Sequence, residues 1–290
     1  MKDYNKFRHT TQRTHTTTSD FAEIAQLIHN AKHLIFTAGA GMGVDSGLPD
    51  FRGNNGFWKA YPMLQGKGFA DMANPQHFEA NPKVGWGFYG HRLNLYRDTT
   101  PHGGFDILRK WANDKSDNYF IYTSNVDGAF QKAGFSSRKV LECHGSIHHL
   151  QGLEARYDRR TKGQIISAEG FEITIDENLQ AQGELPRDEE GNLLRPNILM
   201  FGDWGWDSSR TDKQYRRMDS WLNDVDLRDT VIIEVGAGTS IPSVRRTSEE
   251  FQRAGATLVR INPRESHGGD FCLPMGGLEG LQKINEVYSS

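Results

Sequence analysis

Two short motifs carry polar side chains that could perform acid–base chemistry or hold a sugar. His144 lies in ECHGS, and a histidine can accept a proton from a hydroxyl at physiological pH. Asn125 and Asp127 lie two apart in TSNVD, so an extended backbone would point both to one side, toward ribose hydroxyls or a water molecule. Asn and Asp also favour turns, and a lone histidine among the 11 of this chain is more often structural, so both interpretations stay open.

A glycine-rich loop, GAGMG at residues 39–43, follows an apolar run and could approach a phosphate closely. It lacks the G-x-G-x-x-G spacing of dinucleotide sites, and no acidic residue ends a second strand about twenty positions later. In the adjoining PDFRG, Arg52 could bind an anionic ligand and Phe51 could cover a ring. Alternatively, Asp50 and Arg52 only brace this loop.

The elements that must position these residues alternate between buried strands and amphipathic helices. Apolar runs begin at residues 33, 119, 231 and 257, and each ends in a polar or glycine-rich stretch. Such alternation predicts an α/β fold whose parallel sheet is covered on both faces, with ligands outside the carboxyl ends of the strands. All the motifs above lie at such ends.

Composition divides the chain into a main domain and minor parts. Residues 1–18, rich in Thr, His and Arg, predict a flexible arm, and residues 19–290 predict the catalytic domain. Within that domain, an aromatic-rich segment at about 57–101 predicts a helical insertion. The polar segment at about 151–195 predicts a small inserted module.

Charge and hydropathy exclude several classes of partner. With 34 basic and 37 acidic residues the net charge is -3, which gives no general attraction for nucleic acid or an anionic membrane. No segment approaches the roughly 18 apolar residues of a membrane helix, and the polar N-terminus has no signal-peptide pattern, so we expect a cytoplasmic protein. Cys143 and Cys272 are too few for a four-thiolate zinc site. His148 and His149 near Cys143 lack a second ligand pair, so no metal site is predicted.

Taken together, six motifs in order resemble the sirtuins, the family of NAD-dependent protein deacylases. They are GAG…SGLPDFRG, TSNVDGAFQKAG, ECHGS, RPNILMFGD, GAGTS and INPRE, and the resemblance extends from about His33 to Arg264. It implies a doubly wound, Rossmann-like NAD-binding domain with a smaller inserted module. NAD would lie between the two, and an acylated lysine would enter from the opposite side.

The resemblance also implies roles for individual residues. His144 would be the general base, and Asn125 and Asp127 would act around the nicotinamide ribose and carboxamide. The remaining cofactor residues would be Gly39, Ala40 and Gly41 at the pyrophosphate, Asp50, Phe51, Arg52 and Ser124 near the nicotinamide ribose, and Gly238, Thr239, Ser240 and Asn262 at the adenosine half. Phe201, Gly202 and Asp203 would pair with the backbone of a substrate.

Four departures from the sirtuin pattern qualify these implications. Gly43 replaces the usual serine and Ser124 the usual glutamine, which alters polar contacts near NAD. The zinc-binding cysteine pairs are absent from 151–195, so ordinary packing must hold that module or it is not rigid. In the substrate-pairing stretch, DWGWD replaces the usual residues, and Trp204 and Trp206 could narrow or redirect the acceptor site.

The sequence therefore predicts an NAD-dependent protein lysine deacylase that releases nicotinamide and transfers the acyl group to ADP-ribose. NAD is the expected co-substrate, and an acylated protein of unknown identity is the expected partner. The altered module and DWGWD motivate an alternative, an NAD-consuming protein ADP-ribosyltransferase or NAD hydrolase. A non-catalytic sensor of NAD or ADP-ribose is the third interpretation. Retention of His144 favours deacylation or hydrolysis.

Overall fold

A six-stranded parallel sheet forms the centre of the larger part of the molecule, which we call the large lobe. The computed structural model describes residues 18–49, 59, 61–64, 66–153 and 164–289, so residues 1–17 of the expected arm lie outside it. The strand order is β11-β10-β9-β1-β2-β3, with neighbours parallel throughout. The strands are β1 (His33–Ala38), β2 (Tyr119–Thr123), β3 (Val140–Glu142), β9 (Thr230–Val235), β10 (Thr257–Ile261) and β11 (Phe271–Leu273). The chain leaves β1 first in one direction and later in the other, so the predicted doubly wound α/β class is confirmed.

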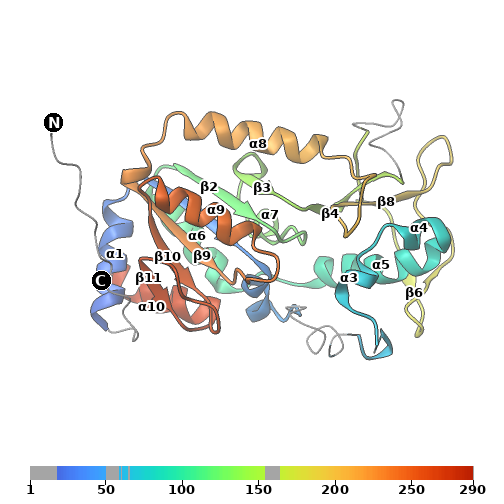
Figure 1. Ribbon diagram of the computed structural model, residues 1–290, viewed down its shortest axis with the longest axis horizontal. Helices are drawn as coiled ribbons and strands as arrows, with labels where there is room; N and C mark the ends of the chain where they lie inside the picture. The colour runs from blue at the N-terminus through green and yellow to red at the C-terminus, as the bar shows by residue number, and fades with distance from the viewer. Residues whose placement is uncertain (1–17, 50–58, 60, 65, 154–163, 290) are drawn as a thin grey trace.

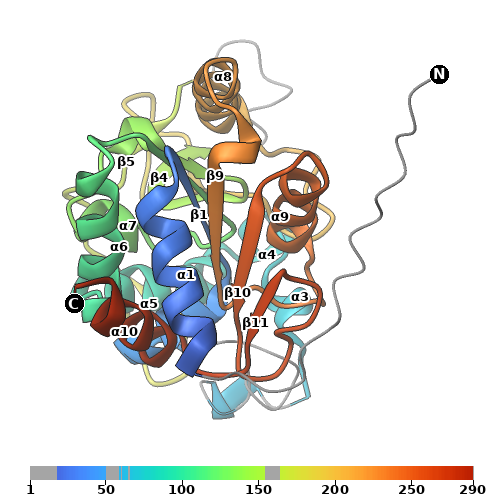
Figure 2. The ribbon, with the colours of Figure 1, turned by 90° about the vertical axis from the view of Figure 1, so that its left-hand side faces the viewer.

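Helices cover both faces of this sheet because alternate strand residues point to opposite sides (Figures 1 and 2). In β1, Leu34 and Phe36 pack in one core with α1 (Thr18–Asn30), α6 (Gly103–Asp114), α7 (Ala129–Lys132) and α10 (Gly277–Tyr288). Ile35 faces the other side, where α8 (Ser209–Leu222) and α9 (Ser243–Arg253) lie. Burial on both faces explains why the strands are nearly continuous apolar runs.

A second core forms a small lobe at the opposite end of the molecule from α1 (Figure 1). The segments expected as two separate insertions, 57–101 and 151–195, both contribute described residues to this one core. Its elements are α3 (Phe69–Met72), α4 (Gln76–Ala80), α5 (Pro82–Asp98), β4 (Gly145–Gly152), β5 (Ile166–Ser167), β6 (Thr174–Ile175), β7 (Ala181–Gln182) and β8 (Leu194–Ile198). Strands β5-β4-β8 form an antiparallel sheet, and β6 pairs with β7.

Helix α5 holds the irregular part of the small lobe by hydrogen bonds and close packing. It begins with Pro82, which suits a first helical position because proline has no N–H to leave unpaired. Four side-chain N–H groups along the helix donate to backbone carbonyls of the small lobe. These bonds join Trp86 Nε1 to Leu194 O (2.9 Å), Asn94 Nδ2 to Ile173 O (2.8 Å), Arg97 Nη1 to Phe171 O (2.8 Å) and Arg97 Nη2 to Ala168 O (2.6 Å). Packing and hydrogen bonding therefore order this segment.

Gly87 allows the backbone of residue 179 to lie directly against α5. A Cβ atom at Gly87 would lie 1.9 Å from the carbonyl oxygen of Leu179, which no real contact permits. The absence of a side chain at this position is thus a condition for docking residues 179–182 on the helix.

No helix among the described residues is long and apolar enough to cross a membrane.

We expect the substitution Gly87→Ala to destabilise the protein, because the new methyl group must displace backbone. The free energy of unfolding should fall by about 1–3 kcal/mol, the usual range for overpacking a core. Gly103→Ala is the matched control, since a Cβ there meets nothing within 4 Å and Gly103 also lies in a helix. Urea unfolding followed by circular dichroism measures both changes, and equal midpoints for the two variants would contradict this packing.

Candidate active site

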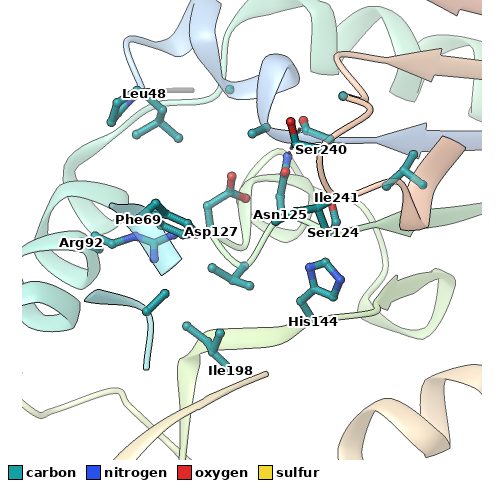
Figure 3. A pocket seen from close by; sticks show the side chains of 18 of the residues that line it. Leu48, Phe69, Arg92, Ser124, Asn125, Asp127, His144, Ile198, Ser240 and Ile241 are labelled. Atoms are coloured by element: carbon teal, nitrogen blue, oxygen red, sulfur yellow. Dashed lines mark hydrogen bonds between the residues drawn. The ribbon is translucent and has the colours of Figure 1, made fainter. Parts of the chain in front are cut away.

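A cavity of about 610 Å³ opens at the carboxyl ends of β1, β2 and β9, between the two lobes (Figure 3). Its walls come from both lobes, which is where a doubly wound sheet places ligands. The predicted site residues that line it are Gly39, Ala40, Ser124, Asn125, Asp127, His144, Phe201, Gly238 and Ser240. Gly41, Gly202, Asp203, Thr239 and Asn262 do not line it, and Asp50, Phe51 and Arg52 lie outside the described residues.

Two glycine loops meet backbone to backbone at one end of the cavity. A Cβ atom at Gly39 would lie 2.7 Å from the carbonyl oxygen of Gly236, and one at Gly236 would lie 2.4 Å from the carbonyl carbon of Gly41. The N–H of Gly41 donates to the carbonyl of Gly236 at 3.0 Å, so this donor braces the loops. Only glycines permit this close approach. Because no side chains stand in the way there, a phosphate could come close to the backbone of the two loops.

Asn125 ties the end of β2 to the first glycine loop. Its Nδ2 donates to the carbonyl of Gly39 at 3.0 Å, and its backbone N–H donates to Thr123 Oγ1 at 3.0 Å. The neighbouring Ser124 N–H donates to the carbonyl of Ala38 at 3.2 Å. The TSNVD motif therefore adopts a fixed conformation in which Asn125 and Asp127 both face the cavity (Figure 3).

Burial shifts the pKa values of two titratable side chains in the cavity, His144 and Asp127. It lowers the pKa of His144 below its ordinary 6.5, opposed by a hydrogen bond with the Ser124 backbone, so the imidazole is neutral near pH 7. His144 Nε2 lies 3.3 Å from Ser243 Oγ. Burial also raises the pKa of the Asp127 carboxyl above 3.8, and the N–H of Ala129, donating to Oδ1 at 2.9 Å, acts in the opposite direction. A histidine with a lowered pKa and an aspartate with a raised pKa thus share one cavity.

Asn262 supports the second glycine loop from behind instead of lining the cavity. Its side chain is fully buried, and its Nδ2 donates to the carbonyl of Ala237 at 2.8 Å. The nearby Glu265 lines the cavity and accepts from both the N–H (3.2 Å) and the hydroxyl of Thr239. Sequence reasoning took Asn262 from INPRE and missed Glu265, although an acidic residue after a strand was the available signal.

The Asp203 side chain does not line the cavity but pairs with another buried side chain. Its carboxylate makes two 2.8 Å hydrogen bonds with Arg195, and both side chains are almost fully buried. Asp203 also accepts from the N–H of Gly205 at 3.1 Å, which fixes the loop around Gly202. Only backbone of this stretch and the ring of Phe201, which is 41% exposed, are available to a ligand.

Arg92 is a further cavity residue that the sequence motifs did not reveal. It is 6% exposed, and its Nε and Nη2 donate to the hydroxyl of Tyr96 at 3.1 and 2.8 Å. Its guanidinium carbon lies 5.4–5.6 Å from the ring centroids of Phe69, Phe88, Tyr89 and Tyr96. These ring faces stabilise a buried positive charge in the wall of the cavity. Its only signal in the sequence is a charge within the aromatic run WGFYGHRLNLY.

The described part of the chain offers no group of three or more His, Cys, Asp or Glu that could hold a metal ion. His148 and His149, which lie near Cys143 in sequence, do not form such a group. The two imidazoles lie in different surroundings.

The sequence matches the model of the Sir2 family over residues 39–241, most of the chain. The chain belongs to the Sir2 family. This Sir2 chain is 28% identical over 236 residues to an NAD-dependent protein deacylase of Aquifex aeolicus, covering 81% of the chain and 84% of that relative. It is 30% identical over 230 residues to one of Leptospira interrogans, covering 79% and 80%.

Solved structures support the fold of the Sir2 chain. The crystal structure of a Sir2 homolog–NAD complex superposes with a TM-score of 0.68 at 23% identity, covering 92% of this chain and 93% of the homolog. At this identity the likeness concerns the fold. It shows that the chain shares the overall fold of that homolog over most of its length.

We expect the His144 imidazole of this Sir2 chain to titrate with a midpoint below 6.5, since burial disfavours its charged form. Nuclear magnetic resonance of the folded protein measures the midpoint, with His144→Gln to assign the signal. In the urea-unfolded protein the same signal should return to the ordinary value. A folded-state midpoint above 6.5 would contradict the burial of this side chain.

Proposed function

We propose that this chain is an NAD-dependent protein lysine deacylase. The observation that carries the proposal is the convergence of His144, Asn125 and Asp127 in one cavity (Figure 3), which residues of the glycine loops and the exposed Phe201 also line. The deacylase names of the relatives support the same activity. An acylated protein would be the partner, and the expected cytoplasmic location stays a prediction.

The residues present suit NAD on structural grounds. Gly39 packs against Gly236 at one side of the cavity, and beside this contact Ala40, Gly238 and Ser240 line the cavity with small side chains that leave room for a phosphate. Bound NAD would supply the ribose carbon that the amide oxygen of the acyl-lysine attacks, and nicotinamide would be the leaving group. Ser124, Asn125 and Asp127, which line the same cavity, would orient that end, and the roles of Asp50, Phe51 and Arg52 stay predictions.

His144 is suited to remove a proton from a ribose hydroxyl. Its lowered pKa keeps the imidazole neutral, and Nε2 lies within reach of another hydroxyl, that of Ser243. A base must be unprotonated and positioned to act, and the lowered pKa and the place of His144 in the cavity support this role. The activity should therefore persist to mildly acidic pH and fall as pH drops through the lowered pKa.

We expect His144→Ala to reduce product formation by ~10²–10⁴-fold, the usual contribution of one general base, while the protein stays folded. His29→Ala, on the exposed surface of α1, is the control and should keep full activity. Mass spectrometry of the products from NAD with and without an acyl-lysine peptide provides the measurement.

The same experiment separates the alternatives. Peptide-dependent nicotinamide and acylated ADP-ribose support deacylation. Free ADP-ribose or labelled protein without any acyl peptide would instead indicate an NAD hydrolase or ADP-ribosyltransferase, which the 74% exposed Trp204 beside the acceptor stretch motivates. NAD that binds and is recovered intact would indicate a sensor.

Arg92 favours an acyl group that carries a negative charge. A buried guanidinium attracts a carboxylate more strongly than an exposed one, because water screens it less. Arg92→Met keeps an unbranched apolar chain and removes the charge. We expect its kcat/KM to fall by ~10–100-fold for a carboxylate-bearing acyl-lysine peptide and much less for an acetyl-lysine peptide, as a hydrogen bond to a charged group predicts.

Arg109→Met, on the exposed side of α6, is the control for this acyl preference and should leave both rates unchanged. Steady-state rates on the two peptides decide the outcome. Equal losses for both peptides in Arg92→Met would assign Arg92 a purely structural role.

A further inference from the structure

His148 contacts the loop that carries Asp127. Its Nε2 lies 2.8 Å from the backbone carbonyl oxygen of Asp127. A carbonyl oxygen can only accept, so the imidazole must carry its proton on Nε2 and donate it. His148 belongs to β4, the strand that begins directly after His144.

Two further contacts from β4 hold the same loop. The N–H of Ile147 donates to the carbonyl of Val126 at 3.0 Å. Gly128, in the left-handed conformation with φ +69°, lies so close to the His148 ring that a Cβ there would be 2.7 Å from His148 Cδ2. Strand β4 of the small lobe therefore contacts three consecutive residues of this loop, 126–128, and holds them in place.

We propose that His148 is a positioning residue that sets the place of Asp127 in the cavity. The Asp127 side chain points into the cavity (Figure 3), and its backbone carbonyl oxygen accepts a hydrogen bond from His148 Nε2. Loss of the His148 bond would free the backbone of Asp127 and displace its carboxylate from NAD. The inference rests on the proposed function, in which Asp127 acts on NAD.

The adjacent His149 provides a matched control. The two histidines are neighbours on β4 and lie in different surroundings. His149 Nδ1 is buried without a hydrogen-bond partner among the described residues, and burial, followed by the charge of Arg210, lowers the pKa of His149 to about 3. No hydrogen bond among the described residues joins its Nδ1 to the loop of Asp127, so we expect His149 not to influence Asp127.

The test is a double-mutant cycle on NAD affinity, measured by isothermal titration calorimetry. His148→Phe should weaken NAD binding by roughly 3–10-fold, the effect of one neutral hydrogen bond, and His148→Gln, which places an N–H near the former Nε2, should restore most of it. In the Asp127→Ala background His148→Phe should change the affinity less than about twofold, since coupled residues are not additive. His149→Phe should not alter it.

An equal loss from His148→Phe in both backgrounds, or no loss, would overturn the proposal. A second measurement separates its failure from failure of the proposed function. Long-range ¹H–¹⁵N spectra of the NAD-free protein at neutral pH should show His148 as the Nε2–H tautomer. The Nδ1–H tautomer would reject the His148 contact whatever the activity, whereas the Nε2–H tautomer in a protein that does not bind NAD would reject only the proposed function.

Discussion

The close approach of two glycine loops at the carboxyl ends of β1 and β9 is the constraint on which the site depends. A Cβ atom at Gly39 would overlap the backbone of Gly236, and a Cβ atom at Gly236 would overlap the backbone of Gly41. This contact lies between neighbouring strands at the point where the order of the sheet reverses, so it leaves a backbone-lined edge beside the cavity. The polar residues after β2 are then placed by reference to it, through the Asn125 bond to Gly39.

The small lobe shows how short strands can be ordered by one helix. Residues of the 166–182 segment have few ladder hydrogen bonds, and α5 supplies donors for their carbonyls. The Arg195–Asp203 pair, buried with all its charge compensated, then fixes the loop that faces the acceptor end of the cavity. Breaking one partner of such a pair usually costs more than the pair itself contributes, so the loop geometry is tightly specified.

Strand β4 connects the two lobes electrostatically as well as mechanically. It begins after His144, whose burial keeps it neutral, and it carries His148 to the carbonyl of Asp127, whose own burial raises its pKa. In the proposed function, the proton-accepting and NAD-orienting groups would therefore be set by one strand of the small lobe and one loop of the large lobe. Relative movement of the lobes would alter both together.

The sequence by itself determined the parallel α/β sheet and the glycine and polar residues at its strand ends that line the cavity, because both follow from short-range patterns: apolar runs that end in Gly, Asn, Asp or His. Tertiary structure decided which side chains face the cavity. Glu265 and Arg92 enter it, whereas Asn262 and Asp203 turn to Ala237 and Arg195. It also separated His148 from His149. These choices depend on partners distant in the chain, such as Asp127 for His148, and local periodicity carries no information about such contacts.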